Sequence, residues 1–211
     1  MPEVALVGRS NVGKSSLINA LARQRIARTS AAPGKTRLAN VYRMARGNAV
    51  PFHLVDLPGY GYSRGQRGAQ ARGEPAFDDI AQAVFARKPA VLLLIDVRHP
   101  GLESDRAAWE WVSGAAADAA VVATKIDKLA RGERIRAMGQ LESVFEASVL
   151  PVSAVTGEGM DELWNLIDSL VNRRNRNNLP SHISRRPPRP TARSRREPPS
   201  EPTRPRHQPK K

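Results

Sequence analysis

The segment from Gly8 to Ser15 constrains the fold of this chain more than any other feature. Its sequence, Gly-Arg-Ser-Asn-Val-Gly-Lys-Ser, fits the pattern G-x-x-x-x-G-K-[ST], in which backbone N–H groups wrap the phosphates of a nucleotide. Residues 4–7 precede it as a short buried strand, and residues 16–21 follow it as an amphipathic helix. The pattern therefore predicts a strand, a phosphate-binding loop and a helix whose N-terminus faces the bound anion.

The small and polar residues of this segment have separate tasks in holding phosphates. Glycine at Gly8 and Gly13 leaves room for the backbone to approach the phosphates closely. Lys14 can reach the β- and γ-phosphates, and the hydroxyl of Ser15 can ligate Mg²⁺. The competing interpretation is a glycine-rich turn that holds no ligand. We predict that a nucleotide contacts the run Gly8, Arg9, Ser10, Asn11, Val12, Gly13, Lys14, Ser15 and Ser16, with Lys14 also taking part in catalysis.

The composition excludes several classes of protein. The 211 residues include no cysteine, which rules out disulfides and thiolate metal sites and agrees with a reducing cytoplasm. The most apolar run, residues 91–95, is far too short to span a bilayer. We therefore expect a cytoplasmic protein with one folded domain and no membrane contact.

Positive charge is concentrated at the end of the chain. Residues 172–211 contain 13 Arg and Lys and two Glu, a net charge of +11 out of +14 for the whole chain, and nine of the 17 prolines. A segment with so little apolar surface cannot offset its ordering entropy, which predicts disorder. Its charge favours a polyanionic partner. We therefore divide the chain into a folded domain, residues 1–171, and a disordered basic tail, residues 172–211.

Hydrophobic periodicity in residues 1–171 alternates between strands and helices. Apolar runs predict strands at 4–7, 38–44, 50–56, 91–97, 120–124 and 149–153. Helical spacing predicts helices at 16–21, 77–85, 103–112, 134–145 and 160–171, while residues 24–37 are expected to form a mobile loop and residues 57–74 a glycine-rich one. This order is typical of an α/β fold. It predicts a mostly parallel six-stranded sheet with one antiparallel edge strand and helices on both faces.

Ligands of such sheets bind at the carboxyl ends of the strands, and a first polar motif follows the strand at 50–56. In Asp56-Leu57-Pro58-Gly59, the carboxylate of Asp56 is placed to hold Mg²⁺ through water. Gly59 lets its backbone N–H approach the γ-phosphate. We assign Asp56, Pro58 and Gly59 to the nucleotide site, and Gly59 to catalysis as well. By itself, D-x-P-G can equally be only a turn.

A second motif, Thr124-Lys125-Ile126-Asp127, follows the strand at 120–124. The carboxylate of Asp127 can accept two parallel hydrogen bonds from guanine, whose donor pair adenine lacks, and the stem of Lys125 can lie on the base. After the last strand, the N–H of Ala154 could bind guanine O6. Each short motif alone is compatible with a solvated strand end. Together, each after a predicted strand, they indicate a GTP-hydrolysing protein that binds through Thr124, Lys125, Asp127, Ser153 and Ala154.

The chain resembles the YihA/EngB family of translation-factor-class GTPases over about residues 2–171. The resemblance rests on residues 8–19, 33–36 (Pro-Gly-Lys-Thr), 56–62 (Asp-Leu-Pro-Gly-Tyr-Gly-Tyr), 95–99 (Ile-Asp-Val-Arg-His) and 124–129 (Thr-Lys-Ile-Asp-Lys-Leu). It implies a bacterial GTP-binding protein that assists assembly of the large ribosomal subunit, with links to cell division and septation. It also implies that Thr36 ligates Mg²⁺ in the triphosphate state and serves catalysis, and that Gly34 lies in the nucleotide site.

The chain departs from the family pattern in two places. Members usually carry a longer segment before the first strand, and residues 63–75 are richer in Gly, Arg and Ala than the same loop of relatives. We therefore expect that contacts made by that loop differ from those of relatives.

The residue that follows Gly59 bears on the rate of hydrolysis. Many GTPases place glutamine there to orient the attacking water, but this chain has Tyr60. A phenol does not offer the paired donor and acceptor of an amide, so we expect slow intrinsic hydrolysis and a switch rather than a metabolic catalyst. Asn11 resembles the asparagine with which some GTPases hold K⁺, although a structural role for it is equally compatible.

The expected ligands and partners follow from these assignments. They are GTP or GDP, Mg²⁺ and the precursor of the large ribosomal subunit with its rRNA, contacted by the basic tail and the loops at 24–37 and 57–75. The protein itself is expected to be a monomer. Three other functions share part of the pattern: a P-loop kinase, a non-enzymatic RNA-binding adaptor, and a tRNA-modifying or membrane-fission GTPase. The first has no need of Thr-Lys-x-Asp, the second leaves the folded domain's motifs unexplained, and the third adds further domains.

Overall fold

The computed structural model describes residues 1–28, 38–60 and 77–178, and its folded unit ends at Asn178. A six-stranded sheet has the order β2-β3-β1-β4-β5-β6. Parallel pairing joins β3 (Phe52–Asp56), β1 (Glu3–Gly8), β4 (Ala90–Asp96), β5 (Asp118–Thr124) and β6 (Val149–Pro151). At the edge, β2 (Asn40–Met44) is antiparallel to β3. The predicted mostly parallel sheet with one antiparallel edge strand is confirmed.

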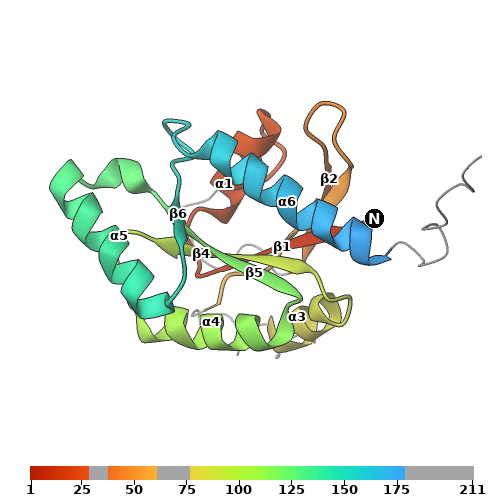
Figure 1. The fold of residues 1–211 in the computed structure, drawn as a ribbon, viewed down its shortest axis with the longest axis horizontal. Helices are drawn as coiled ribbons and strands as arrows, with labels where there is room; N and C mark the ends of the chain where they lie inside the picture. Colours follow the sequence, from red (N-terminus) through yellow and green to blue (C-terminus); the bar gives the residue numbers. More distant parts are fainter. Residues whose placement is uncertain (29–37, 61–76, 179–211) are drawn as a thin grey trace, which may run out of the picture. The chain divides into compact units, whose positions relative to one another are not determined.

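Helices cover both faces of this sheet (Figure 1). On one face lie α1 (Lys14–Ala22) and α6 (Met160–Asn178). On the other lie α3 (Phe77–Phe85), α4 (Glu103–Ala115) and α5 (Arg131–Phe145). A 3₁₀ turn, η1 (Ile126–Lys128), follows β5. Because side chains of a strand alternate between faces, Val4 and Leu6 of β1 join the core under α1 and α6, and Ala5 and Val7 join the other core.

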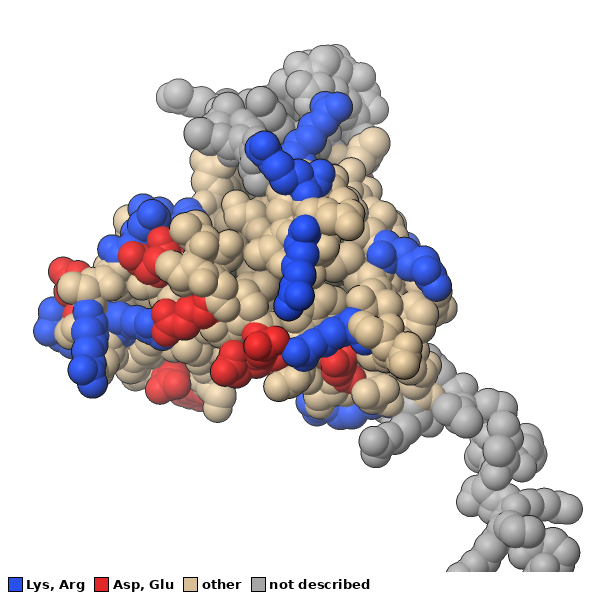
Figure 2. All heavy atoms as spheres, turned by 90° about the horizontal axis from the view of Figure 1, so that it is seen from above, with Lys and Arg blue, Asp and Glu red and all other residues tan. Residues whose placement is uncertain are grey.

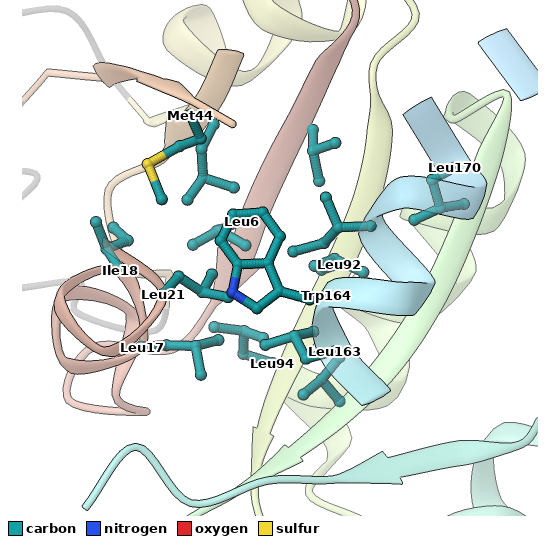
Figure 3. Packing of buried hydrophobic residues seen from close by; sticks show 14 of the residues in the cluster. Leu6, Leu17, Ile18, Leu21, Met44, Leu92, Leu94, Leu163, Trp164 and Leu170 are labelled. Carbon is teal, nitrogen blue, oxygen red and sulfur yellow. The ribbon is translucent and has the colours of Figure 1, made fainter. Parts of the chain in front are cut away.

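The apolar stripe predicted for the last helix holds α6 on the sheet. Figure 3 shows Trp164 among residues of α1 and of the sheet, including Leu17, Leu21 and Leu6. Its ring also meets that of Phe52 edge to face, with 6.2 Å between centroids. The stripe is buried at every position: Leu163, Trp164, Ile167, Leu170 and Val171. Burial of each such side chain contributes about 1.5–3 kcal/mol, so α6 is an integral layer of the domain.

The same helix corrects the predicted domain boundary. It continues to Asn178 instead of ending at Val171, so residues 172–178 are helical and not disordered. These residues have no apolar stripe, but they extend the hydrogen-bond ladder of turns that packing has already fixed. The Arg173 guanidinium also contacts Asp118 at 3.4 Å. The rest of the predicted tail, residues 179–211, lies outside the described residues.

The predicted mobile loop at 24–37 begins as a fixed segment. The Asn19 side-chain oxygen accepts hydrogen bonds from the N–H groups of Ile26 (2.9 Å) and Ala27 (2.8 Å), and its amide donates to the Ala27 carbonyl at 2.9 Å. Residues 29–37, and residues 61–76 of the second predicted loop, are outside the described part. Nowhere in the three described ranges is a helix both long and apolar enough to cross a bilayer.

Candidate functional site

The polar motifs meet at one edge of the sheet, the edge formed by the carboxyl ends of the parallel strands, because the strands that carry them are parallel and adjacent. β1 lies between β3 and β4, so the loop that leaves β1 is flanked by the segments that follow these two strands. The segments after β5 and β6 lie further along the same edge. Pairing of the strands thus gathers residues that are far apart in the sequence.

The phosphate loop, residues 8–15, has the backbone of an anion-binding turn. Asn11 and Gly13 have φ angles of 64° and 113°, and the second lies in a region that glycine enters without strain. A left-handed residue within a turn directs neighbouring N–H groups into a concavity that binds anions. Because α1 begins at Lys14, the free N–H groups of its first turn adjoin this concavity.

Lys14 places a positive charge inside the loop. Its ammonium donates hydrogen bonds to the carbonyls of Gly8 (2.8 Å) and Arg9 (3.1 Å), and the side chain is buried. Burial lowers the pKa of Lys14 to about 8, and the negative charge of Asp56 opposes this shift only in part. The loop therefore holds a desolvated cation, whose interaction with an anion is much stronger than it would be in water.

Asp56 lies at the end of β3 with a buried carboxylate. Its Oδ1 atom has no hydrogen-bond partner among the described residues. Burial raises the pKa of Asp56 to about 6, against the opposing effect of Lys14. An unpaired buried carboxylate oxygen is costly unless a cation or water completes it. Mg²⁺ takes such oxygens, often through water, so Asp56 and the hydroxyl of Ser15 fit this metal.

Thr124 and Lys125 tie the end of β5 to the phosphate loop. The Thr124 hydroxyl is buried and donates to the carbonyl of Val12 at 2.7 Å. The Lys125 ammonium donates to the carbonyl of Asn11 and, at 2.9 Å, to the carboxylate of Asp96. The Thr124 hydroxyl is thus engaged within the protein, and this residue acts on the site by fixing the loop.

Asp96, the last residue of β4, received no role from the sequence. Its carboxylate accepts hydrogen bonds from the Arg98 side chain at 2.9 and 2.6 Å, and from the Arg98 backbone N–H at 3.1 Å. Burial raises the pKa of Asp96, but the hydrogen bonds from Arg98 and Lys125 outweigh it and hold the pKa well below its usual range. Asp96 is therefore a fixed anion that orients the Lys125 ammonium.

Asp127 and Ser153 meet across the ends of β5 and β6. The buried Ser153 hydroxyl donates to Asp127 Oδ1 at 2.7 Å and accepts from the N–H groups of Val155 (3.2 Å) and Thr156 (3.1 Å). Burial raises the pKa of Asp127, but the hydrogen bonds, that from Ser153 above all, leave it below its usual value. No hydrogen bond within the described ranges uses the N–H of Ala154. Asp127 thus lies against Ser153, whose neighbour Ala154 has a backbone N–H with no hydrogen-bond partner in the described part of the chain.

The segment that follows Asp56 packs against the phosphate loop. Pro58 is buried, and a Cβ atom on Gly59 would lie 2.6 Å from the backbone N of Ser10. The Ser10 N–H donates to the carbonyl of Tyr60 at 3.3 Å. Glycine at this position thus permits contact between two backbones, a constraint that the D-x-P-G motif alone does not indicate.

The structure brings the predicted residues that it describes to one edge, and it adds two acids. Gly34 and Thr36 lie outside the described residues. Asp96 could have been suspected from the segment 95–99, which carries part of the family resemblance. Asp105 of α4 is fully buried and bonds to Arg9 and Tyr60. Nothing in the sequence pointed to it, because pattern analysis does not pair residues that are 96 positions apart.

Comparisons with known proteins agree with this geometry. A family described as "50S ribosome-binding GTPase" matches residues 3–125. A protein of Alkaliphilus metalliredigens, named probable GTP-binding protein EngB, is 36% identical over 197 residues, which are 90% of this chain and 89% of that protein. Its namesake from Heliobacterium modesticaldum is 40% identical over 177 residues, with 82% and 84% covered. The fold is similar to that of Aquifex aeolicus Era bound to GDP·AlF₄⁻, with a TM-score of 0.70, 24% identity and coverage of 80% of this chain and 56% of that one.

Proposed function

This chain belongs to the 50S ribosome-binding GTPase family, with EngB proteins as relatives over most of its length, and on that premise we propose that it is a guanine-nucleotide switch in assembly of the large ribosomal subunit. GTP binding and hydrolysis follow from the family. The observation that best supports the detailed assignment is the gathering of the phosphate loop, Asp56 and the Asp127–Ser153 pair at one sheet edge.

In the phosphate half of the site, the phosphate-loop amides and Lys14 bind the β- and γ-phosphates. Ser15 and Asp56 hold Mg²⁺, Asp56 through water, and the unpaired Oδ1 atom of Asp56 supports that role. The metal, when bound, neutralises charge that develops on the phosphates during transfer. Thr36 completes the metal site in the triphosphate state, as the family resemblance implies.

In the base half, Asp127 recognises guanine and the N–H of Ala154 binds O6. The Ser153 hydroxyl donates to one carboxylate oxygen and the Lys128 ammonium lies 3.2 Å from the other, and each oxygen keeps a further lone pair that can accept from the base. We expect Asp127→Asn to weaken GTP binding at least about a hundredfold, because a charge-assisted contact to two donors is lost. The same variant should prefer xanthosine triphosphate, whose ring offers the complementary edge.

Calorimetric titration with both nucleotides measures this exchange. Asp118→Asn is the matched control, since Asp118 lies at the opposite end of β5 and pairs only weakly, at 3.4 Å, with Arg173. Unchanged GTP affinity in Asp127→Asn would remove the guanine assignment.

Hydrolysis without an activator is slow because Tyr60, the residue that follows Gly59, does not orient the attacking water. The Tyr60 hydroxyl donates to Asp105 at 2.8 Å and is thereby engaged away from any such task. A slow chemical step makes the lifetime of the GTP state long, which suits a switch that reports its state to a partner.

The partner proposed is the large-subunit precursor, with rRNA contacted by the basic end of the chain. On the face drawn in Figure 2, Lys and Arg side chains are spread out, with Asp and Glu among them toward one side. Residues 179–211, by contrast, hold ten Arg and Lys and two Glu. Polyanion binding is therefore best supported for this segment, which we propose as the RNA-binding arm of a cytoplasmic, monomeric protein.

Truncation after Asn178 keeps all of α6 and tests the arm. Each phosphate contact adds about 0.7–0.9 to the slope of log affinity against log salt, so loss of about five contacts should flatten the slope by about 3–5 units. Binding of the full-length and 1–178 forms to large-subunit particles is measured across a salt series, with GDP and with a non-hydrolysable GTP analogue. Superimposable slopes would show that the arm contacts no RNA, and equal binding with both nucleotides would argue against a switch.

A further inference from the structure

Asp105, in the first turn of α4, is a buried acid that lies outside the nucleotide contacts assigned above. Its carboxylate is inaccessible to solvent, yet two donors reach it from other parts of the chain. The Nε atom of Arg9 donates to both oxygens, at 2.9 and 3.2 Å, and the hydroxyl of Tyr60 donates to Oδ1 at 2.8 Å. A buried carboxylate that loses such a donor is strongly destabilised, so each of these bonds holds its donor firmly.

The two donors belong to the two segments that face the phosphates. Arg9 is in the phosphate loop, and Tyr60 directly follows Gly59. Their backbones also touch: Arg9 and Tyr60 form a β-bridge, and the Ser10 N–H donates to the Tyr60 carbonyl at 3.3 Å. Gly59 lies so close to Ser10 that a Cβ atom would meet its backbone at 2.6 Å. Asp105 thus fixes the segment with Gly59 against the rim of the phosphate loop through contacts that lie wholly within the protein.

We infer that Asp105 is a positioning residue which, through Tyr60, presets the N–H of Gly59 for the terminal phosphate and so makes the site distinguish GTP from GDP. This inference rests on the proposed nucleotide site. A segment that is ordered before binding loses little conformational entropy when the ligand arrives, and the saving appears as affinity. GDP has no γ-phosphate and makes no use of Gly59, so its affinity gains nothing from this preordering.

A purely structural role for Asp105 would have a different result. If the carboxylate only joins α4 to the sheet, its loss lowers the stability of the whole domain and acts on both nucleotides alike. The ratio of the two affinities therefore separates the two roles, and it is unaffected by a uniform loss of folded protein.

The test uses the full chain with Tyr60→Phe and Asp105→Asn, singly and together, and with Asp118→Asn as the control. Tyr60→Phe removes one hydroxyl and keeps the ring, so it remains informative if Asp105→Asn fails to fold. Calorimetry gives the affinities for GDP and for a non-hydrolysable GTP analogue. We expect the preference for the analogue over GDP to fall about tenfold in each single variant, the effect of one hydrogen bond to a charged group, while GDP affinity changes by less than about twofold.

The double variant should lose no more than Asp105→Asn alone, because that substitution already removes the charged acceptor of the Tyr60 hydroxyl together with the ion pair to Arg9. An unchanged affinity ratio, an equal loss for both nucleotides, or a ratio that rises would each overturn the inference. Failure of the wild-type protein to bind GDP would instead overturn the proposed nucleotide site, so the two failures are distinguishable.

Discussion

Replacing Asp56 by asparagine should stabilise the nucleotide-free protein while it weakens nucleotide binding with Mg²⁺. The carboxylate is 2% exposed, and its Oδ1 atom has no partner in the described part of the chain. Burial raises the pKa of Asp56 from 3.8 to about 6. A difference of about two pH units corresponds to about 3 kcal/mol, which is what the ionised form costs the folded state at neutral pH.

The sign of the pH dependence follows from this shift. An acid whose pKa is higher in the folded state binds more protons there, so stability falls as pH rises from about 4 to about 6 and is constant above. The side chain of the Asp56→Asn variant carries no charge at any pH, but its amide remains a buried polar group, so we expect a net gain of about 1–2 kcal/mol at pH 7. For a domain of this size the midpoint of thermal unfolding should rise by about 3–6 °C. At pH 5 the cost of the ionised carboxylate is about half of its value at pH 7, so the net gain should shrink by about 1.3 kcal/mol and leave less than about 0.7 kcal/mol.

Urea unfolding of nucleotide-free protein in a chelator measures the free energy of unfolding of wild type and Asp56→Asn at pH 5 and pH 7. Both pH values lie below the pKa of Lys14, about 8, so titration of that lysine contributes little. Asp118→Asn is the control, because it removes only an exposed ion pair with Arg173. In a second assay, Asp56→Asn should lose most of the Mg²⁺ dependence of GTP binding. A variant that is less stable than wild type at pH 7, or whose advantage does not shrink at pH 5, would refute the argument that burial of this charge is unfavourable.

Two further predictions concern residues of the site. Ser153→Ala should weaken GDP binding about tenfold and lower the free energy of unfolding by about 1–2 kcal/mol, since the hydrogen bond to Asp127 is lost while the amides at 155 and 156 regain water. Calorimetry and thermal unfolding measure these changes. The control is Thr156→Ala, which removes only a 3.4 Å contact to the Glu158 N–H. If Asn11 holds K⁺ beside the phosphates, replacing K⁺ by Na⁺ at constant ionic strength should slow GTP hydrolysis, and Asn11→Ala should abolish the difference. Equal rates of phosphate release in the two salts would leave Asn11 a structural residue.

Local sequence patterns predicted the elements and the sheet edge, but not the contacts that fix the site. The helical spacing of its apolar residues predicts α3 with the bounds that it has in the structure, Phe77 and Phe85. The extension of α6 beyond Val171 was missed, since a segment of Asn and Arg has no apolar periodicity and is helical only as a continuation of packed turns. Motifs follow strands, so Asp56 and Asp127 could be placed in advance.

Pairing between distant segments is a different kind of information. Asp105 reads in the sequence as one more acid in the first turn of a helix, where carboxylates are common because of the helix dipole. Only the three-dimensional arrangement shows that α4 places this buried carboxylate within hydrogen-bond distance of Arg9 and Tyr60. Likewise, the position of Thr124 at the end of β5 could be predicted, whereas the direction of its hydroxyl, toward the carbonyl of Val12, could not.

The hydrogen bonds from Thr124 and Lys125 to the carbonyls of Val12 and Asn11 fix the end of β5 at a set distance from the phosphate loop. If these segments bind the nucleotide as proposed, the distance between the segment assigned to the base and the loop assigned to the phosphates is set by the protein itself, since hydrogen bonds join the two. A nucleotide whose sugar is replaced by a longer or shorter spacer can satisfy one end or the other, but not both. Discrimination by the length of the spacer would then require no contact to a sugar hydroxyl, because the separation of the two segments is fixed.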